Sequence, residues 1–327
     1  MQRVILISGG DGFVGNAMAS WYLARGEHVF VVDDHSSGVP RAPHPRRTLV
    51  RQDVCRLEPS QIPRTSLVLH LASPAAPSLF ARDPMRVIRP NTAGTEKLLE
   101  IALRDGCRMI FASTSEVYGD GDPARGPGQA FVEDQRVTHG TLTERSCYAA
   151  AKRVGEEIVN AARGRGADAT SVRLFNVYGP GMDPTLPGYG RVVPSFVRSI
   201  ARGEPLTVHG DGRQVRSFLW IDDLVEAITR LARRPGSLPA ALNIGRDEPI
   251  EIRELADLVE RTAGTKVGRR HVERATDDPA WRRPDCGRLH DLVRWTPRVG
   301  LAEGVQRLVD AELGRPVRHG EEAAPCP

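Results

Sequence analysis

The sequence predicts an α/β fold, in which a doubly wound parallel sheet carries helices on both faces and is joined by a smaller C-terminal α/β domain. Three observations lead to this prediction. Short apolar runs, typical of buried parallel strands, alternate with helix-length patterns through the first half of the chain. A glycine-rich turn directly follows the first of these runs. The chain has 327 residues, 40% of them hydrophobic, which is enough to bury a large core.

The elements of the first half alternate along the chain. Strands are predicted at residues 4–7, 29–32, 48–50, 67–71, 109–112 and 170–174. Helices are predicted between them at residues 16–24, 91–104 and 149–162. Because strands connected in this way run parallel, their carboxyl ends meet at one edge of the sheet, where ligands bind.

The sequence changes character after residues 179–181, where shorter elements and more frequent Gly and Pro begin. Helices are predicted at 192–202, 221–231 and 252–263, and short strands at 206–208 and 241–244. We expect residues 1–178 to form the first domain, joined by elements within 217–250, and residues 179–313 to form mainly the substrate-binding domain. Residues 314–327 are predicted to be a disordered tail, and residues 120–128 a loop.

The composition argues against several classes of protein. The formal net charge is +4, but the basic residues are dispersed without interleaved aromatic residues, which is unlike a nucleic-acid-binding surface. No apolar run reaches the ~18 residues of a membrane span and no signal-peptide pattern is present, so we expect a cytoplasmic protein without membrane contact. The five cysteines lack CxxC spacing and the nine histidines lack ligand spacing, so no metal site is expected.

The glycine-rich segment GGDGFVG lies between the first predicted strand and the first predicted helix. Gly9, Gly12 and Gly15 have the spacing G-x-x-G-x-x-G, a variant of the Rossmann fingerprint. Small residues there let the backbone N–H groups of the helix start, which includes Phe13 and Val14, approach a pyrophosphate. The first domain is therefore predicted to be a Rossmann-type domain that binds a dinucleotide.

Two acidic residues, Asp33 and Asp34, follow the second predicted strand, and Asp33 lies 18 residues after Gly15. An acidic side chain at this place accepts hydrogen bonds from the ribose hydroxyls of adenosine. Two acids would also repel a 2′-phosphate, so NAD is favoured over NADP. Arg41, in the loop that follows, is the nearest cation that could oppose this preference.

Further cofactor contacts are expected after the third and fourth strands. Asp53, which is followed by Val54, can reach an adenine amino group, and capping a helix is an equally good explanation of the same residue. Leu71, Ala72 and Ser73 end the fourth strand, where small residues suit a backbone packed against the cofactor.

An acid–base set follows in the middle of the chain. Thr114 and Glu116 lie in the segment STSEVY, and Tyr148 and Lys152 are four residues apart at the start of a predicted helix, hence on one face. An ammonium beside a phenol lowers the tyrosine pKa from about 10, so the phenol can take a proton from an alcohol while hydride leaves the carbon. The pattern Y-x-x-x-K alone is common on surface helices. The dinucleotide motif upstream is what favours a catalytic role for Tyr148 and Lys152.

Together these motifs resemble the extended short-chain dehydrogenase/reductase family of nucleotide-sugar enzymes, and within it the UDP-glucuronate decarboxylase (UDP-xylose synthase) group. The resemblance runs from residue 3 to about residue 313. It rests on GGDGFVG (9–15), HLASP (70–74), NTAGT (91–95), STSEVYGD (113–120), and Tyr148 with Lys152. It continues in FNVYGP (175–180), GRVV (190–193), GEPLTV (203–208) and DDPAWRRPD (277–285).

The resemblance implies NAD-dependent decarboxylation of UDP-glucuronate. Sugar C4 is oxidised while Tyr148 takes the hydroxyl proton, with Thr114 bonded to the same oxygen. The β-keto acid then loses CO₂, and reduction of the ketone gives UDP-xylose. Glu116 works near the carboxylate and C5, where its carboxyl either has a raised pKa or destabilises the charged substrate. Arg282, or its neighbour Arg283, is the partner for the sugar carboxylate.

The remaining site residues are also implied by the resemblance. Substrate contacts are implied for Ser115, Asn176, Arg191, Val192 and Arg216, and a cofactor contact for Asn91. Asn176, Arg191 and Arg216 would hold the UDP moiety. Family members usually pair through the helices equivalent to 91–104 and 149–162, so a homodimer is expected.

Alternatives remain open. Ser115 stands where nucleotide-sugar 4,6-dehydratases carry the Asp that protonates the leaving hydroxyl, and epimerases of the group have small or hydroxyl residues in place of Glu116. The competing hypotheses are a UDP-glucuronate 4-epimerase, or another nucleotide-sugar 4-keto enzyme, and a non-catalytic NAD-binding protein. Ser113 and Glu116 could also form a capping box.

The segment 120–143 is longer than expected for the group, and it should lie over the sugar site. If this segment closes the site loosely, a UDP-4-keto-pentose could be released before the final reduction.

Overall fold

One parallel sheet of seven strands organises the first half of the chain. The computed structural model describes residues 3–75, 77–126, 128–137, 143, 146–182, 191–275 and 278–316. The strand order is β11-β6-β5-β4-β1-β2-β3, and each neighbouring pair is parallel. The strands are β1 (Val4–Ser8), β2 (His28–Asp33), β3 (Arg47–Arg51), β4 (Leu67–His70), β5 (Arg108–Thr114), β6 (Ala169–Leu174) and β11 (Ala241–Ile244). The predicted doubly wound fold is confirmed.

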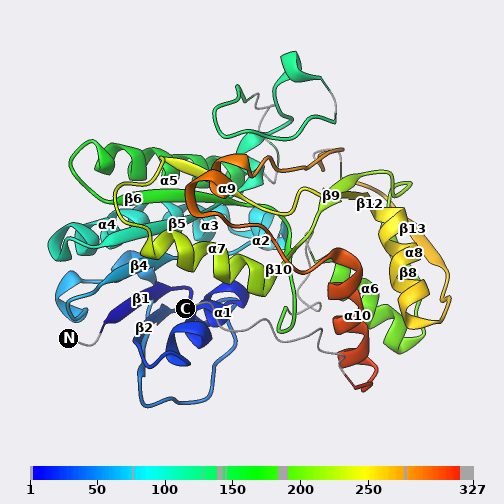
Figure 1. Ribbon diagram of the computed structural model, residues 1–327, viewed down its shortest axis with the longest axis horizontal. Helices are drawn as coiled ribbons and strands as arrows, with labels where there is room; N and C mark the ends of the chain where they lie inside the picture. Colours follow the sequence, from blue (N-terminus) through cyan, green and yellow to red (C-terminus); the bar gives the residue numbers. More distant parts are fainter. Residues whose placement is uncertain are drawn as a thin grey trace.

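Helices cover both faces of this sheet (Figure 1). Along β1, Ile5 and Ile7 join one hydrophobic cluster and Leu6 joins another, because successive side chains of a strand point to opposite faces. The first face carries α1 (Phe13–Leu23) and α7 (Ile221–Arg233). The other face carries α3 (Pro84–Asn91), α4 (Ala93–Asp105) and α5 (Ser146–Arg163).

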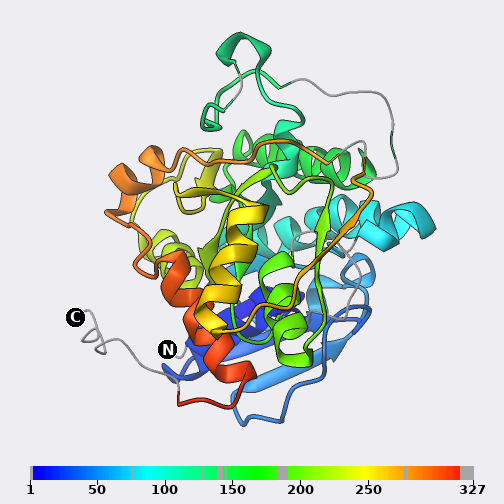
Figure 2. The ribbon, with the colours of Figure 1, turned by 90° about the vertical axis from the view of Figure 1, so that its right-hand side faces the viewer.

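The second half of the chain adds a smaller lobe, at the right of Figure 1 and facing the viewer in Figure 2. Its helices are α6 (Val192–Arg202), α8 (Ile252–Ala263) and α10 (Leu301–Glu312), with α9 (Gly287–Val293) beside β11. Its short strands pair as β8 (Leu206–His209) with β13 (Arg269–Val272), and β9 (Val215–Ser217) with β12 (Pro249–Glu251). A last pair, β7 (Val177–Tyr178) with β10 (Leu219–Trp220), leads from the sheet into the lobe.

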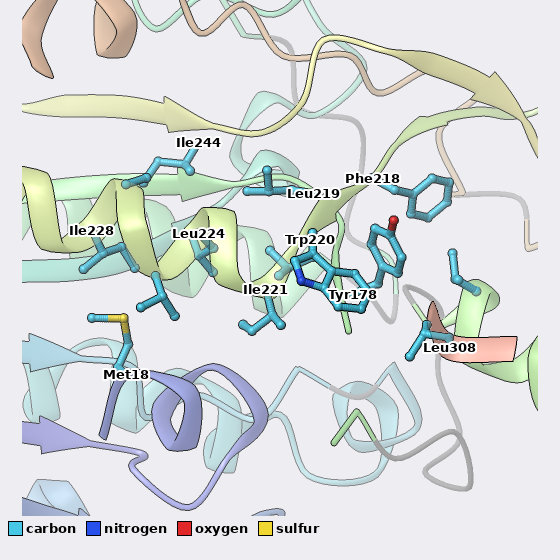
Figure 3. Close-up of a cluster of buried hydrophobic side chains, with 14 of the residues drawn as sticks. Met18, Tyr178, Phe218, Leu219, Trp220, Ile221, Leu224, Ile228, Ile244 and Leu308 are labelled. Atoms are coloured by element: carbon cyan, nitrogen blue, oxygen red, sulfur yellow. The ribbon is translucent and has the colours of Figure 1, made fainter. Parts of the chain in front are cut away.

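A continuous hydrophobic cluster joins the lobe to the sheet layers. The rings of Tyr178 and Trp220 pack edge to face with their centroids 5.4 Å apart, between Ile221 of α7 and Leu308 of α10 (Figure 3). Each fully buried side chain of this size contributes roughly 1.5–3 kcal/mol to folding. Because both halves share this core, the lobe is held in a fixed position relative to the sheet. Side chains of the lobe therefore face the carboxyl edge of the sheet in a defined geometry.

Several helices differ from the sequence predictions. The helical pattern at 91–104 covers the last residue of α3 and nearly all of α4, which are separated at Thr92 (φ −114°, ψ −84°). The short helix α2 (Pro77–Arg82) was not predicted, nor was α10.

Two further sequence predictions concern membrane-spanning helices and the C-terminal tail. Within the described ranges, no helix combines the length and the apolar character that crossing a membrane requires. The predicted tail from residue 314 onward falls outside the described residues, apart from residues 314–316.

Candidate active site

Two adjoining cavities lie at the carboxyl ends of the sheet strands. The first, of about 230 Å³, is lined by the ends of β2, β3 and β4 and by α3. The second, of about 350 Å³, extends from the glycine-rich loop to Arg282 in the lobe. Gly9, Gly12, Leu71 and Ser73 line both cavities, so the two are neighbouring ends of one cleft.

In the glycine-rich loop between β1 and α1, Gly9 and Gly15 have no room for a side chain. A Cβ on Gly15 would lie 2.0 Å from the carbonyl oxygen of Gly9, and a Cβ on Gly9 would lie 2.7 Å from the backbone nitrogen of Ala72. The α1 helix begins after Gly12 without a side-chain cap, and its first turn has no acidic residue. Its first N–H groups are therefore available to a phosphate, and the loop fits the dinucleotide that its spacing predicts.

The two acidic residues at the end of β2 line the first cavity but differ in their bonding. Asp33 is buried, and its two carboxylate oxygens accept the backbone N–H groups of Asp11 (2.9 Å) and His35 (2.8 Å). Burial raises the pKa of Asp33, and these two hydrogen bonds oppose the rise. Asp34 is exposed and accepts the N–H of Ser36 at 2.8 Å. Asp33 thus shapes the following loop as well as facing the cavity.

The other predicted cofactor residues have mixed outcomes. Asp53 accepts the N–H of Cys55 as the cap of a short 3-10 turn and also lines the first cavity, and its contact with an adenine amino group stays a prediction. The same cavity is lined by Val54, Leu71, Ala72 and Ser73. Asn91, for which a cofactor contact is predicted, is not among the residues that line the two cavities. It is fully buried and donates to Ser73 Oγ (2.9 Å) and to the Val87 carbonyl (2.7 Å), so it positions Ser73 instead.

Tyr148 and Lys152 lie at the start of α5, and both line the second cavity. The Thr114 side chain forms a hydrogen bond with the Tyr148 phenol, and the Phe80 ring stacks on the Tyr148 ring with 5.0 Å between centroids. The Lys152 ammonium donates to the Ala112 carbonyl at 2.5 Å and lies 5.9 Å from the centroid of the Tyr148 ring. The hydroxyl, phenol and ammonium predicted from sequence therefore meet in one place.

The pKa of Tyr148 differs in direction from the prediction. Burial raises the pKa of Tyr148 to about 12, the Thr114 hydrogen bond opposes the rise, and the Glu116 carboxylate adds to it. Burial also lowers the pKa of Lys152 to about 7, against the effect of the Glu156 carboxylate. In the protein alone, loss of hydration therefore sets the direction of the pKa shift of both groups.

Glu116 and Arg282 meet at the lobe end of the second cavity. Arg282 Nη2 lies 3.5 Å from Glu116 Oε2, and Arg282 Nη1 donates to the Gly119 carbonyl at 2.6 Å. Arg282 is 2% exposed, whereas Arg283 pairs with Asp247 on the surface. Of the two neighbouring arginines, Arg282 is thus the one that reaches the cavity.

The segment STSE does not form the capping box considered above. Ser113 Oγ donates to Glu156 Oε1 at 2.5 Å instead. The cap of the 3-10 turn Ser115–Tyr118 is Thr114, whose hydroxyl accepts the N–H of Glu116 at 3.3 Å. Thr114 therefore orients the start of the turn that carries Glu116 and also contacts the phenol.

Further polar groups line the second cavity, both from the segments that follow β5 and β6 and from the lobe. Its lining includes Ser115, Asn176, Arg191 and Arg216. Arg216 Nη2 donates to Asp278 Oδ1 at 2.8 Å, and burial lowers the pKa of Arg216 against the effect of Asp278. Val192, predicted as a substrate contact, does not line the cavity, because it begins α6 and packs against the hydrophobic cluster. Guanidinium groups at this end suit a diphosphate.

Phe80 and Arg41 are among the side chains that line the second cavity without having been predicted to do so from the sequence. Phe80 comes from the short helix α2 and is 3% exposed beneath Tyr148. Arg41 was considered only as a partner for a 2′-phosphate, yet it lines the second cavity with Phe13 and Val14 and not the first. The position of Arg41 shortly after the end of β2 was the sequence signal that could have indicated its place in the cleft. No sequence pattern indicated Phe80.

The described part of the long segment 120–143 does not cover the second cavity. None of residues 120–126 and 128–137 lines it. Phe131 pairs instead with the chain beside Arg282, donating its N–H to the Arg283 carbonyl (2.8 Å) and accepting that of Asp285 (2.9 Å). The predicted position over the sugar site is therefore not seen here, and residues 127, 138–142, 144 and 145 lie outside the described residues.

Known proteins resemble this chain in sequence and in structure. Residues 5–245 match the NAD dependent epimerase/dehydratase family. The chain belongs to this family. UDP-glucuronic acid decarboxylase 1 of Arabidopsis thaliana is 35% identical over 315 residues, which cover 93% of this chain and 68% of that protein.

Solved structures agree with this membership. UDP-glucose 4-epimerase of Thermus thermophilus, in complex with NAD, is 26% identical with a TM-score of 0.83, covering 95% of this chain and 99% of that chain. MoeE5, in complex with UDP-glucuronic acid and NAD, is 26% identical with a TM-score of 0.79, covering 92% of this chain and 96% of that chain. The predicted resemblance to the family and the prediction of NAD as cofactor are confirmed.

Proposed function

We propose that the protein is a UDP-glucuronate decarboxylase, which oxidises sugar C4, releases CO₂ and reduces the ketone to give UDP-xylose. Support comes from the plant relative named for this activity and from MoeE5, whose structure contains UDP-glucuronic acid and NAD. The observation that carries the proposal is the Glu116–Arg282 pair in the cavity that also holds Tyr148 and Lys152.

The Glu116–Arg282 pair suits a substrate that carries a carboxylate. Their 3.5 Å contact is longer than a charge-assisted hydrogen bond of about 2.7–2.9 Å, so Arg282 retains capacity for another anion. A sugar carboxylate bound to Arg282 would lie close to Glu116. Two carboxylates in one site raise the energy of the charged state, and departure of CO₂ relieves that repulsion.

The reaction uses Tyr148 and Thr114 at the C4 oxygen. Tyr148 accepts the hydroxyl proton as hydride leaves C4; when bound, NAD⁺ supplies the hydride acceptor and later the donor. The C4 ketone makes the substrate a β-keto acid, so the bond from C5 to the carboxylate breaks and its electron pair moves toward the C4 oxygen. Hydrogen bonds from Thr114 and Tyr148 stabilise the charge on that oxygen. C5 then takes a proton from water, and Tyr148 returns its proton to the C4 oxygen at the final reduction.

Mass spectrometry of the product tests the proposal. Purified protein incubated with NAD⁺ and UDP-glucuronate should yield UDP-xylose, a product that has lost CO₂ and contains no ketone. An unchanged mass with an altered sugar would establish the 4-epimerase instead, and an unaltered substrate would favour a non-catalytic NAD-binding protein. Loss of CO₂ with a ketone retained would show that reduction fails and a UDP-4-keto-pentose is released.

Glu116→Gln separates decarboxylation from oxidation. The amide keeps the size of the side chain but removes its charge, so the variant should bind NAD⁺ with unchanged affinity and release CO₂ about 100-fold more slowly. Release of labelled CO₂ measures the effect. Glu312→Gln, at the exposed end of α10, is the matched control and should retain full activity. Full CO₂ release by Glu116→Gln would refute the role assigned to this residue.

We further propose that the protein is a cytoplasmic homodimer that pairs through α4 and α5. In support, Leu103 of α4 and Val154 of α5 are 46% and 47% exposed, so pairing of these helices would remove apolar surface from water. Ala150 and Ala161 lie on the same exposed face of α5 as Val154 and would allow close helix packing. Light scattering should give twice the chain mass, and Val154→Glu should give a monomer; a monomeric native protein would refute the pairing.

A further inference from the structure

The segment after β2 is fastened to the glycine-rich loop through Asp11. This residue is 1% exposed, and its carboxylate contacts Arg47 Nη2 at 2.5 Å and His35 Nε2 at 2.7 Å. The Asp11 carbonyl also accepts the N–H of Val39 at 3.2 Å, and a Cβ on Gly38 would come within 3.0 Å of Asp11. An acidic side chain in a phosphate-binding loop would repel the phosphate, but here its charge is opposed by Arg47 and it holds the following segment in place.

Two residues beyond Val39, the chain brings Arg41 into the second cavity. Arg41 lines that cavity together with Phe13 and Val14, at the open start of α1. Its Nε is buried and has no hydrogen-bond partner among the residues that the structure describes. A buried guanidinium nitrogen without an acceptor is unfavourable unless a ligand provides one.

We propose that Arg41 binds the pyrophosphate of NAD and that Asp11 is the positioning residue that holds it there. The α1 start supplies backbone N–H groups, and Arg41 adds a charged donor that can contact two phosphate oxygens. Asp33 and Asp34 line the first cavity, which does not include Arg41, so this cation does not offset their discrimination against a 2′-phosphate. The inference rests on NAD as the cofactor and is independent of which sugar reaction follows.

Binding measurements without any sugar nucleotide test the proposal. In isothermal titration, Arg41→Gln should weaken NAD⁺ and ADP-ribose about 10- to 100-fold, because each loses a charge-assisted contact, and leave adenosine unchanged. Arg46→Gln, an exposed position in the same segment, is the matched control and should bind all three ligands as the native protein does. Unchanged ADP-ribose affinity in Arg41→Gln would overturn the proposal.

A second variant and a second dinucleotide sharpen the result. Asp11→Asn should also weaken the binding of ADP-ribose, but by less than Arg41→Gln does. Arg41 is retained in this variant, and only the contacts that position its segment are altered. If Arg41→Gln weakens NADP⁺ more than NAD⁺, Arg41 recognises the 2′-phosphate and the proposal is wrong. Should the protein prove to be an epimerase, these binding results would still decide the role of Arg41.

Discussion

The two ends of the cleft are assembled in different ways. The first cavity takes its lining from residues 9–90, at the ends of neighbouring strands and at α3. The second draws on residues as distant as Phe13 and Arg282, and it exists only because the hydrophobic cluster packs the lobe against the sheet. The cofactor end is therefore a local consequence of the parallel sheet, whereas the sugar end depends on the complete fold. Substitutions at the two ends should accordingly affect different measurements.

The largest effect is expected at the sugar end, from Tyr148→Phe. Removal of the phenol oxygen eliminates the group that takes the C4 proton, so oxidation should slow about 10²- to 10⁴-fold while NAD⁺ affinity stays the same. The phenyl ring can still stack on Phe80, which limits structural change. Stopped-flow absorbance of NADH after mixing with UDP-glucuronate measures the rate. Tyr22→Phe, at a buried tyrosine of α1 outside both cavities, should retain activity; NADH formation at the native rate in Tyr148→Phe would contradict the assignment.

The same contrast explains what could be predicted from sequence. Gly9 and Asp33 were predictable because strand–turn–helix spacing alone brings them to one edge. Tyr148 and Lys152 were predictable as neighbours from their four-residue spacing, but the direction of the tyrosine pKa was not, since spacing does not reveal burial. Arg282 came only from the resemblance.

Packing decided the residues that sequence reasoning left open or placed wrongly. Arg282 faces the cavity and Arg283 the surface because the chain beside them pairs with Phe131. Asn91 supports Ser73 rather than lining the cavity, and no sequence pattern distinguishes these two roles.

A smaller effect is expected at the cofactor end, from Asp33→Asn. The amide removes the negative charge that we expect to face the ribose, and it replaces one acceptor of a backbone N–H by a donor. The dissociation constant of NAD⁺ should rise about tenfold, and the preference over NADP⁺ should fall. Turnover at saturating NAD⁺ should stay near the native value, which distinguishes this end from the sugar end.

Asp34→Asn is the matched control for Asp33→Asn, because Asp34 lines the same cavity but is exposed. Its effect on NAD⁺ affinity should be smaller. If the two variants weaken NAD⁺ binding equally, the burial and the backbone hydrogen bonds of Asp33 have no special importance for affinity. Titration with NAD⁺ and NADP⁺ decides between these outcomes.

Glu156 supports the catalytic helix from behind the cavity. It lies one turn after Lys152 on α5, and its carboxylate accepts Arg173 Nε (2.9 Å), Arg173 Nη2 (2.7 Å) and Ser113 Oγ (2.5 Å). Arg173 Nη1 also donates to the Tyr118 hydroxyl at 3.0 Å. These contacts join α5 to β5 and β6, so Glu156 affects the sugar end by position and by charge.

The smallest effect on the rate at neutral pH is expected from Glu156→Gln. This variant is also the most direct test of the charge of the Glu156 carboxylate. The Glu156 carboxylate raises the pKa of Lys152, which burial brings down to about 7, so removal of the charge lowers that pKa further. Because Lys152 must carry a proton to favour the phenolate, activity falls as pH rises through the Lys152 pKa. The alkaline side of the pH–rate profile should therefore move to lower pH, by about one unit, with little loss of rate at acidic pH. Glu157→Gln, at the exposed neighbouring position of the same helix, should leave the profile unchanged. If both variants show the native profile, Glu156 acts through structure alone and the Lys152 protonation state does not limit the rate.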